Sequence, residues 1–398
     1  MLAKSCAASK QNQLMRKILY IQYANPAAYP PIEYSSQILA EAGFQICLLG
    51  VKSFGSESMC LPDFPNIRVE VLPYTPPGWR QKLAFLKFLA RSLATARTWK
   101  PDWIYVSDVM AAPSGLLLSR LFGCKVIYHE HDSPVTTTQT SLFIRLILAA
   151  RGALARRAEF IVIPQEQRIE IFRSAMKTPR PMIRVLNCPR KTTTLHQALV
   201  QRAPDEALSV YFHGSINLDR VPLTLIAAAA RIDIPVRIRI VGYETIGSKG
   251  TCDRLRAAVA EAGGQVSIEF PGSFPSHDSL RQQMTGMHIG WINYINRSHD
   301  VNLTHLEGAS NKAFDYLAAG LPLIVPQAAG WENMFVAPGY AKACDPNDVE
   351  EIANLLRWFY ENPAEAAAMG RDGQQRTREE WNYEAQFAPV MSRLSDGN

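Results

Sequence analysis

Short apolar runs alternate with amphipathic segments along most of the chain, and this alternation constrains the fold more than any other feature. In the first half, the expected strands are residues 17–23, 44–49, 103–106, 125–128, 160–163 and 184–186. Helical patterns separate them, for example at residues 33–42 and 114–121. Short apolar runs between helices are typical of strands buried on both faces of a parallel sheet. The pattern therefore predicts a doubly wound α/β fold.

The alternation stops at residues 189–207, a polar stretch with three consecutive threonines, and then resumes. The second series of expected strands is residues 209–213, 236–241, 266–270, 289–292 and 323–325. A chain of 398 residues exceeds what one hydrophobic core usually holds. We therefore expect two Rossmann-like, doubly wound domains that face a cleft.

The expected organisation has five parts. They are a loose leader at 1–15, a first domain at 16–190, a linker at 191–207, a second domain at 208–375 and a C-terminal helix at 376–398. The last part carries Trp381, Tyr383 and Phe387 in a polar setting. Large aromatic side chains at a chain end usually pack onto something, so we expect this helix to dock back on the first domain.

Cysteine usage and hydropathy bear on the compartment. The seven cysteines are scattered and never form a CxxC pair, which argues against a disulfide framework and a structural zinc site. No apolar run reaches the length of a membrane span, and the first fifteen residues lack the apolar core of a signal peptide. These features predict a cytoplasmic protein that can rest peripherally on the inner face of the membrane.

Charge is distributed unevenly between the two halves. Residues 1–190 hold 24 Lys and Arg against 12 Asp and Glu, whereas residues 191–398 hold 18 against 24. A basic half indicates an anionic partner. Solvated helix faces explain the same excess, so both interpretations stay open.

The segment from Glu307 to Pro322, followed by a short apolar strand, carries the most chemical information. Ser310 or Asn311 can cap a helix of about three turns that ends near Gly320. The N-terminus of such a helix offers free N–H groups and a positive dipole end to a diphosphate, and Lys312 adds a charge. Asp315 lies one turn further along the helix, where its carboxylate can accept hydrogen bonds from two ribose hydroxyls. Glu307 precedes the helix, within reach of a sugar.

These residues resemble the acidic pair of the retaining GT-B glycosyltransferases, above all glycosyltransferase family four. In that family two glutamates, the second eight positions after the first, precede an Ala-x-Gly-x-Pro turn and a strand. Glu307 and Gly308 match the first acid and its glycine, and Gly320 and Pro322 match the turn. Asp315 departs from the pattern, because the family has glutamate there. The resemblance implies that Glu307 acts in catalysis and that Asp315 binds the donor.

Three further segments resemble the donor site of the same family. After a strand, Gly214 and Arg220 match a glycine and a basic residue that holds the diphosphate, although Ser215 replaces a second basic residue. An ordinary surface arginine is the alternative for Arg220. Two strand ends resemble the loops beside the base. The resemblance therefore assigns ten residues to the donor: Gly214, Arg220, Gly242, Tyr243, Ser273, Phe274, Ser310, Asn311, Lys312 and Asp315.

In the first domain, residues 129–132 (His-Glu-His-Asp) close a strand. Catalytic groups in open α/β sheets lie at the carboxyl ends of strands, and the family often has a histidine there. His131 fits that position, with Glu130 or Asp132 to orient it, and a core histidine is the alternative. The four residues also suggest a metal site, but neighbours on a strand point to opposite faces. We expect no metal and no cofactor.

The resemblance implies a glycosyltransferase that moves a sugar, with retention, from a nucleoside-diphosphate sugar to a glycan, lipid-linked or other acceptor hydroxyl. Stabilisation of the leaving diphosphate is then the main task of the protein. Two other functions fit the same residues: a sugar-nucleotide epimerase of the same fold class, and a nucleotide-binding pseudoenzyme that acts as a partner-binding module. We expect no nucleic acid partner.

Two stretches without acidic residues suggest an anionic membrane surface as a partner. Residues 71–101 contain six cations around Leu83, Leu86, Leu89, Leu93 and Trp99. Residues 133–158 contain Arg145, Arg151, Arg156 and Arg157 around Leu142, Phe143, Leu146 and Ile147. Basic amphipathic helices bind the headgroup layer of a bilayer. Apolar stripes that pack on the sheet are the alternative, and both can hold at once.

Overall fold

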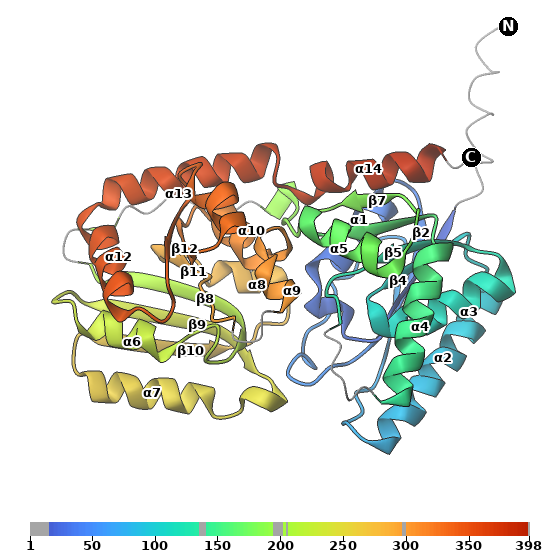
Figure 1. Cartoon of the computed structure of the whole chain (residues 1–398), viewed down its shortest axis with the longest axis horizontal. Coiled ribbons are helices and arrows are strands. Elements are labelled where there is room, and N and C mark those ends of the chain that lie inside the picture. Colours follow the sequence, from blue (N-terminus) through green and yellow to red (C-terminus); the bar gives the residue numbers. More distant parts are fainter. Residues whose placement is uncertain (1–15, 135–140, 194–201, 204–205, 297–299, 397–398) are drawn as a thin grey trace, which may run out of the picture.

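The computed structural model describes residues 16–134, 141–193, 202–203, 206–296 and 300–396. The expected leader and most of the expected linker lie outside these residues. The chain forms two domains side by side, each a parallel sheet with helices on both faces (Figure 1). The prediction of two Rossmann-like domains is therefore confirmed.

The first domain holds a seven-stranded parallel sheet in the order β3-β2-β1-β4-β5-β6-β7. Its strands are β1 (Lys17–Gln22), β2 (Gln45–Val51), β3 (Ile67–Leu72), β4 (Trp103–Ser107), β5 (Lys125–His129), β6 (Phe160–Ile163) and β7 (Met182–Arg184). Its helices and short turns are η1 (Pro26–Ala28), α1 (Pro30–Glu41), α2 (Trp79–Trp99), η2 (Val109–Ala111), α3 (Ala112–Phe122), α4 (Leu142–Arg157), α5 (Glu166–Met176) and η3 (Lys191–Thr193).

The apolar runs form the central strands of this sheet, as expected. The edge strand β3 has no counterpart among the sequence expectations, because Arg68 and Glu70 interrupt its apolar residues and none of its side chains is fully buried. At the other edge, β7 begins two residues before the expected strand at 184–186. Helix α1 begins at Pro30, earlier than expected, since two prolines occupy its first positions, where a missing N–H costs nothing.

The second domain holds a six-stranded parallel sheet in the order β10-β9-β8-β11-β12-β13. Its strands are β8 (Leu208–Ile216), β9 (Val236–Glu244), β10 (Val266–Gly272), β11 (Ile289–Trp291), β12 (Leu323–Pro326) and β13 (Ala341–Cys344). Its helices and short turns are α6 (Leu223–Ala230), η4 (Ile246–Ser248), α7 (Thr251–Ala262), α8 (His277–Gln282), α9 (Val301–Thr304), η5 (Glu307–Ala309), α10 (Asn311–Ala318), α11 (Ala329–Trp331), η6 (Glu332–Val336), α12 (Val349–Glu361) and α13 (Pro363–Glu379).

Two details of this domain differ from expectation. Helix α10 spans eight residues, about two turns instead of three. The edge strand β13 was not expected, because the sequence Ala-Lys-Ala-Cys lacks the β-branched and aromatic residues that favour strands.

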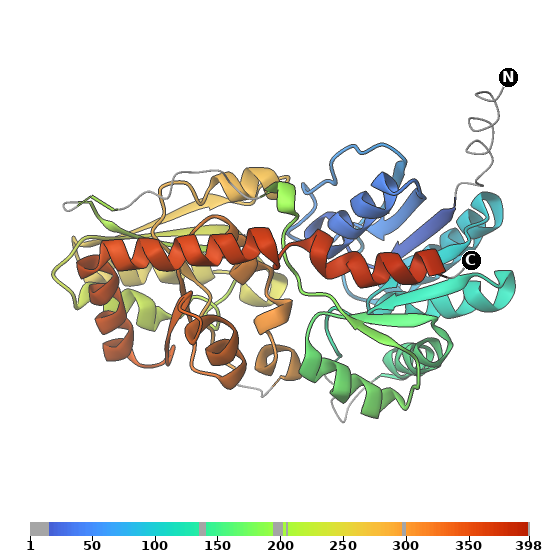
Figure 2. The same ribbon diagram turned by 90° about the horizontal axis from the view of Figure 1, so that it is seen from above.

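The chain returns to the first domain at its end, where α14 (Tyr383–Asp396) follows α13 across both domains (Figure 2). Residues 380–382 separate the two helices, and the Asn382 side chain accepts a hydrogen bond from the Ala385 N–H over 2.9 Å. The second helix therefore begins at Tyr383, not at residue 376. Tyr383 and Phe387 are fully buried in the core of the first domain. No helix of the described residues is both long and apolar enough to cross a bilayer.

Candidate active site

A pocket of about 140 Å³ lies where β8 and β9 end, against the N-terminus of α10. Ligands of doubly wound sheets bind at the carboxyl ends of strands, beside a change in strand order. The second sheet changes order between β8 and β11, so the pocket lies in that crevice. Eight of the ten residues assigned to the donor line it: Gly214, Gly242, Tyr243, Ser273, Phe274, Asn311, Lys312 and Asp315.

The other two, Arg220 and Ser310, line an adjoining cavity of about 20 Å³. Lys312 lines both spaces, so the ten residues surround two neighbouring cavities on either side of this lysine. Arg220 donates through Nη1 to Ser215 Oγ over 2.8 Å. Ser310 occupies the N-cap position of α10, but its side chain makes no capping hydrogen bond. This helix end can therefore bind an anion.

Two glycines let the strand ends approach each other beside α10. Gly214 and Gly242 are register partners in β8 and β9, and both have positive φ, 122° and 143°. A Cβ on Gly242 would overlap the carbonyl oxygen of Gly214, and a Cβ on Gly214 would lie 3.0 Å from Lys312 Cε. A side chain at position 214 would therefore crowd Lys312, whereas one at position 242 would force the two strand ends apart.

Lys312 is the lysine that lines the donor pocket, and its pKa is lowered. Its ammonium lies 5.6 Å from the ring centre of Phe212. Desolvation and, to a smaller extent, the positive charge of Arg220 lower the pKa of Lys312 to about 7, while Asp315 opposes the shift. A diphosphate placed between Lys312 and Arg220 would favour the protonated ammonium.

Asp315 is paired with a histidine that the sequence reasoning did not single out. His213 Nε2 lies 3.6 Å from Asp315 Oδ2, and both side chains are buried. Burial lowers the pKa of His213, although Asp315 partly offsets this effect. His213 also lines the pocket, so a neutral imidazole and a carboxylate face the same ligand. The sequence signal that could have identified His213 is its position directly before Gly214, near the end of a strand.

Glu307 lies apart from this pocket, at the interface between the domains. The residue is 2% exposed, and its Oε1 accepts a hydrogen bond from Gln165 Nε2 of the first domain. Gly330 packs against the carboxylate, because a Cβ there would overlap it. Among the described residues, Oε2 has no hydrogen-bond partner. A buried carboxylate oxygen without a donor is costly, and a ligand hydroxyl would supply one.

His131 lies directly after β5, at the carboxyl edge of the first sheet. Its Nε2 lies 3.0 Å from Ser107 Oγ, and its ring centre lies 5.4 Å from that of Tyr29. Burial, with a contribution from the positive charge of Arg168, lowers the pKa of His131 to about 3. The imidazole is therefore neutral near pH 7 and can donate or accept a hydrogen bond, but it carries no charge.

The expectation that Glu130 or Asp132 orients His131 is wrong, because Ser107 does so. Glu130 points to a different cluster, where its Oε2 accepts from Arg151 Nε over 2.7 Å. The alternation of side chains along the strand end explains the difference. In the part of the chain that the structure describes, no three His, Cys, Asp or Glu side chains are placed to bind a metal ion.

The first domain also forms part of the pocket wall, through Ala28, Pro30 and Met59. Ala28 ends η1 and Pro30 begins α1, both in the segment that follows β1. Nearby, His277 Nδ1 lies 2.9 Å from Glu33 Oε2 across the interface. The donor pocket is therefore closed by both domains.

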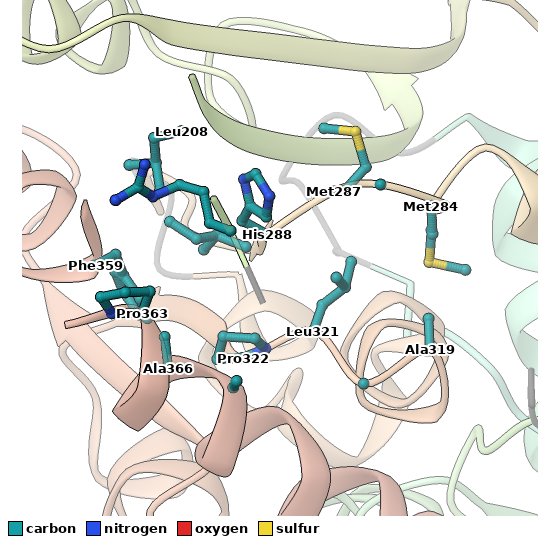
Figure 3. A pocket seen from close by; sticks show the side chains of 15 residues that line it. Leu208, Met284, Met287, His288, Ala319, Leu321, Pro322, Phe359, Pro363 and Ala366 are labelled. Carbon is teal, nitrogen blue, oxygen red and sulfur yellow. The ribbon is translucent and has the colours of Figure 1, made fainter. Parts of the chain in front are cut away.

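A second, smaller cavity of about 50 Å³ lies at the opposite edge of the second sheet. Figure 3 shows Leu208, His288 and Pro322 around it, at or just before the starts of β8, β11 and β12. A space of this size holds a few water molecules at most. It lies at the C-terminal end of α10, where Ala319 lines it, and shares no residue with the donor pocket at the N-terminus of that helix.

Two Rossmann-like domains that close over a pocket at the N-terminus of a helix define the GT-B class of proteins. Comparison with protein families agrees. A model described as "Glycosyl transferase 4-like domain" matches residues 36–189, and one described as "Glycosyl transferase-like" matches residues 225–392. The two matches together cover most of the chain. The chain is a glycosyltransferase with the GT-B fold.

Solved structures agree on the fold. Sucrose-phosphate synthase from Thermosynechococcus elongatus aligns with a TM-score of 0.72 at 17% identity, over 96% of this chain and 100% of that chain. HepE from Anabaena, in complex with UDP and glucose, aligns with a TM-score of 0.70 at 16% identity, over 96% and 100%. A UDP-forming trehalose-phosphate synthase from Burkholderia vietnamiensis aligns with 0.64 at 12% identity, over 96% and 100%. No curated protein sequence matches this chain.

Proposed function

We propose that this enzyme transfers a sugar, with retention, from a nucleoside-diphosphate sugar to a hydroxyl of a glycan or a lipid-linked acceptor. The observation that carries the proposal is that eight of the ten assigned residues line one pocket at the N-terminus of α10, while the other two line a neighbouring cavity that shares Lys312 with it. HepE of Anabaena, which has the same fold, was solved with UDP and with UDP-glucose. UDP-sugars are therefore the first donors to test.

The residues around α10 suit the charge that develops during transfer. The acceptor oxygen forms a bond to the anomeric carbon while the bond from that carbon to the diphosphate breaks. Negative charge on the departing diphosphate falls between Lys312, Arg220 and the end of the helix dipole. The acceptor proton leaves with the diphosphate, so neutral His131 need not act as a base. These cations make a resident metal ion or cofactor unnecessary in the proposed reaction.

A titration followed by a transfer assay tests the proposal. We expect a sugar conjugate of UDP, GDP, ADP or CMP to raise the melting temperature of the protein. The matching radiolabelled donor should then label an acceptor extract equally with and without a chelator. NMR of the product should show the anomeric configuration of the donor. Nucleotide binding without transfer would indicate a pseudoenzyme, and an isomerised sugar nucleotide would indicate an epimerase.

The same proposal places the first domain on an anionic membrane surface, on the cytoplasmic side. The six described cysteines are free, as is usual in a reducing compartment. Five apolar side chains on α2 and α4 are exposed, between 49% and 70%, and we call them the apolar patch: Trp79, Leu83, Leu86, Leu142 and Leu146. The two helices are neighbours, since the rings of Phe85 and Phe143 lie 5.2 Å apart.

The apolar residues that the sequence placed along α2 and α4 fall into exposed and buried or half-buried groups in the structure. Leu83 and Leu86 face outward, whereas Leu89, Leu93 and Trp99 are half-buried. Arg151 is buried and paired with Glu130, so it does not belong to the basic surface. Exposed Arg80, Lys82, Lys87 and Arg145 remain near the apolar patch. Co-sedimentation with vesicles should rise with anionic lipid content and fall with salt. No binding at any lipid charge would remove this part of the proposal.

A further inference from the structure

A cavity of about 610 Å³ lies in the first domain, where β1, β2 and β3 end and α2 begins. It is larger than the donor pocket and formed by the first domain alone. Aromatic and aliphatic side chains form much of its wall: Tyr23, Val51, Leu72, Pro73, Tyr74, Trp79 and Leu83. A cavity of this size can hold a ligand of many atoms.

Its charged lining is entirely basic, with Lys52, Arg80, Lys87 and Arg91. Two of these cations already have partners. Arg91 is paired with Glu70, and Lys52 Nζ donates to the Glu57 carbonyl over 3.1 Å. Within the described part of the chain, Arg80 and Lys87 form no ion pair. Two uncompensated cations beside apolar walls match a ligand that has both an anionic group and a hydrocarbon part.

The cavity lies between the donor pocket and the apolar patch. The loop after β2 contributes Ser53 to this cavity and Met59 to the donor pocket. In the same loop, Gly55 packs against the Tyr243 ring, which a Cβ there would overlap. On the other side, Trp79 and Leu83 line the cavity and also belong to the apolar patch. An occupant would therefore reach from the membrane-facing helix towards the donor.

We propose that this cavity binds the acceptor, and that the acceptor is an amphiphile with a phosphate group. Its phosphate contacts Lys87 and Arg80, and its hydrocarbon chain lies along Trp79 and Leu83 towards the apolar patch. The hydroxyl that receives the sugar is on the side of the loop after β2. This assignment rests on the proposed function, since it names the acceptor class for the same transfer.

Calorimetry with dodecyl phosphate, below its micelle concentration and without donor, tests the assignment. Inorganic phosphate and dodecyl maltoside supply the anionic and the apolar parts separately. We expect dodecyl phosphate to bind at least tenfold more tightly than either, because each lacks one set of contacts. Equal affinity for inorganic phosphate would overturn the apolar part, equal affinity for dodecyl maltoside would overturn the anionic part, and no binding of dodecyl phosphate would overturn both.

Two lysines of α2 provide matched variants. Lys87 lines the cavity, whereas Lys82 is exposed on the same helix outside it. Lys87→Ala should weaken dodecyl phosphate binding about tenfold, the effect of one charged hydrogen bond, and Lys82→Ala should change it less than twofold. Equal losses in both variants would show that a general surface charge attracts the ligand, and the assignment would be wrong.

Titration with UDP separates this assignment from the proposed function. Lys87→Ala should bind UDP as the parent does, because the residue lies outside the donor pocket. A parent protein that binds dodecyl phosphate through Lys87 but no nucleotide would contradict the proposed donor and leave the cavity assignment intact. A parent that binds UDP but not dodecyl phosphate would contradict the cavity assignment alone.

Discussion

The donor pocket and the cavity of the first domain occupy equivalent edges of two similar sheets, yet they are built differently. The donor pocket measures about 140 Å³ and is lined by both domains, with glycines at the strand ends and a buried His213–Asp315 pair. The cavity of the first domain measures about 610 Å³ and is lined by one domain, with long cationic side chains on apolar walls. A small pocket between two domains with fixed polar groups favours one rigid ligand, whereas a larger cavity with flexible cations suits a ligand of variable shape.

Substitution of His131 should have the largest effect and tests whether the first domain contributes to the reaction as well as to acceptor binding. We expect His131→Ala to lower kcat at least a hundredfold, since removal of one positioned hydrogen-bonding group typically costs this much. UDP affinity should stay within twofold of the parent value. Because the pKa of His131 is about 3, its titration should not appear in a rate profile between about pH 5 and about pH 8.

Ser107→Ala is the control, because it removes the partner of His131 and keeps the ring. It should lower kcat by a smaller factor, and both variants should melt close to the parent. A loss of UDP affinity as large as the loss of kcat would show that His131 supports donor binding. Unfolding of His131→Ala would favour a structural histidine.

The next largest effect should distinguish an acid of the donor pocket from an acid outside it. Asp315→Ala should weaken nucleotide binding by roughly 2–3 kcal/mol, because a buried carboxylate that accepts two hydroxyls is lost. This corresponds to a Kd about 30- to 150-fold higher. Calorimetry with UDP measures it, and Asp253→Ala, which alters an exposed acid on α7, should have no effect. Parental affinity in Asp315→Ala would mean that the acidic motif does not bind the donor.

The sequence predicted those residues of the donor site whose positions follow from the local sequence around them. The N-terminus of α10, Lys312 and Asp315 fall within five residues, and Gly214 and Gly242 each end an apolar strand. Helix periodicity and strand ends place such residues without knowledge of the rest of the fold. The two parallel sheets were predictable for the same reason.

The remaining contacts join segments that are distant in the sequence. Gln165 reaches Glu307 from the other domain, Ser107 orients His131 from a neighbouring strand, and Met59 completes the donor pocket. No local pattern indicates which side chains meet when two domains close. Likewise, the stripes on α2 and α4 predicted amphipathic helices, but only the packed structure distinguishes outward Leu86 from half-buried Leu89.

A pH dependence of intermediate size should belong to the donor pocket alone. Lys312 has a pKa of about 7, so it loses its charge as the pH rises through that value. The affinity for UDP-glucose, whose diphosphate does not titrate near neutrality, should therefore fall above about pH 7, by up to about tenfold per pH unit. Lys312→Gln should bind more weakly and lose this slope, whereas Lys249→Gln should keep it. A parental affinity that does not change with pH would contradict the proposed contact with the diphosphate.

The smallest effect tests the membrane side of the comparison. Leu86 and Leu146 belong to the apolar patch, with exposures of 58% and 62%, and neither lines the adjacent cavity. If they enter the headgroup layer, Leu86→Asn and Leu146→Asn should each weaken vesicle binding about threefold, since only part of each side chain leaves water. Leu121→Asn is the matched control, because Leu121 is 61% exposed at the end of α3. That end contacts the C-terminal end of α4 through Ser119 and Arg157, whereas Leu142 and Leu146 lie at the start of α4. Transfer to an acceptor in detergent should be unchanged in all three variants, whereas transfer to the same acceptor in vesicles should fall in the first two. Equal vesicle binding by all three variants would mean that charge alone attracts the first domain to vesicles. The exposed leucines of the apolar patch would then contact another partner.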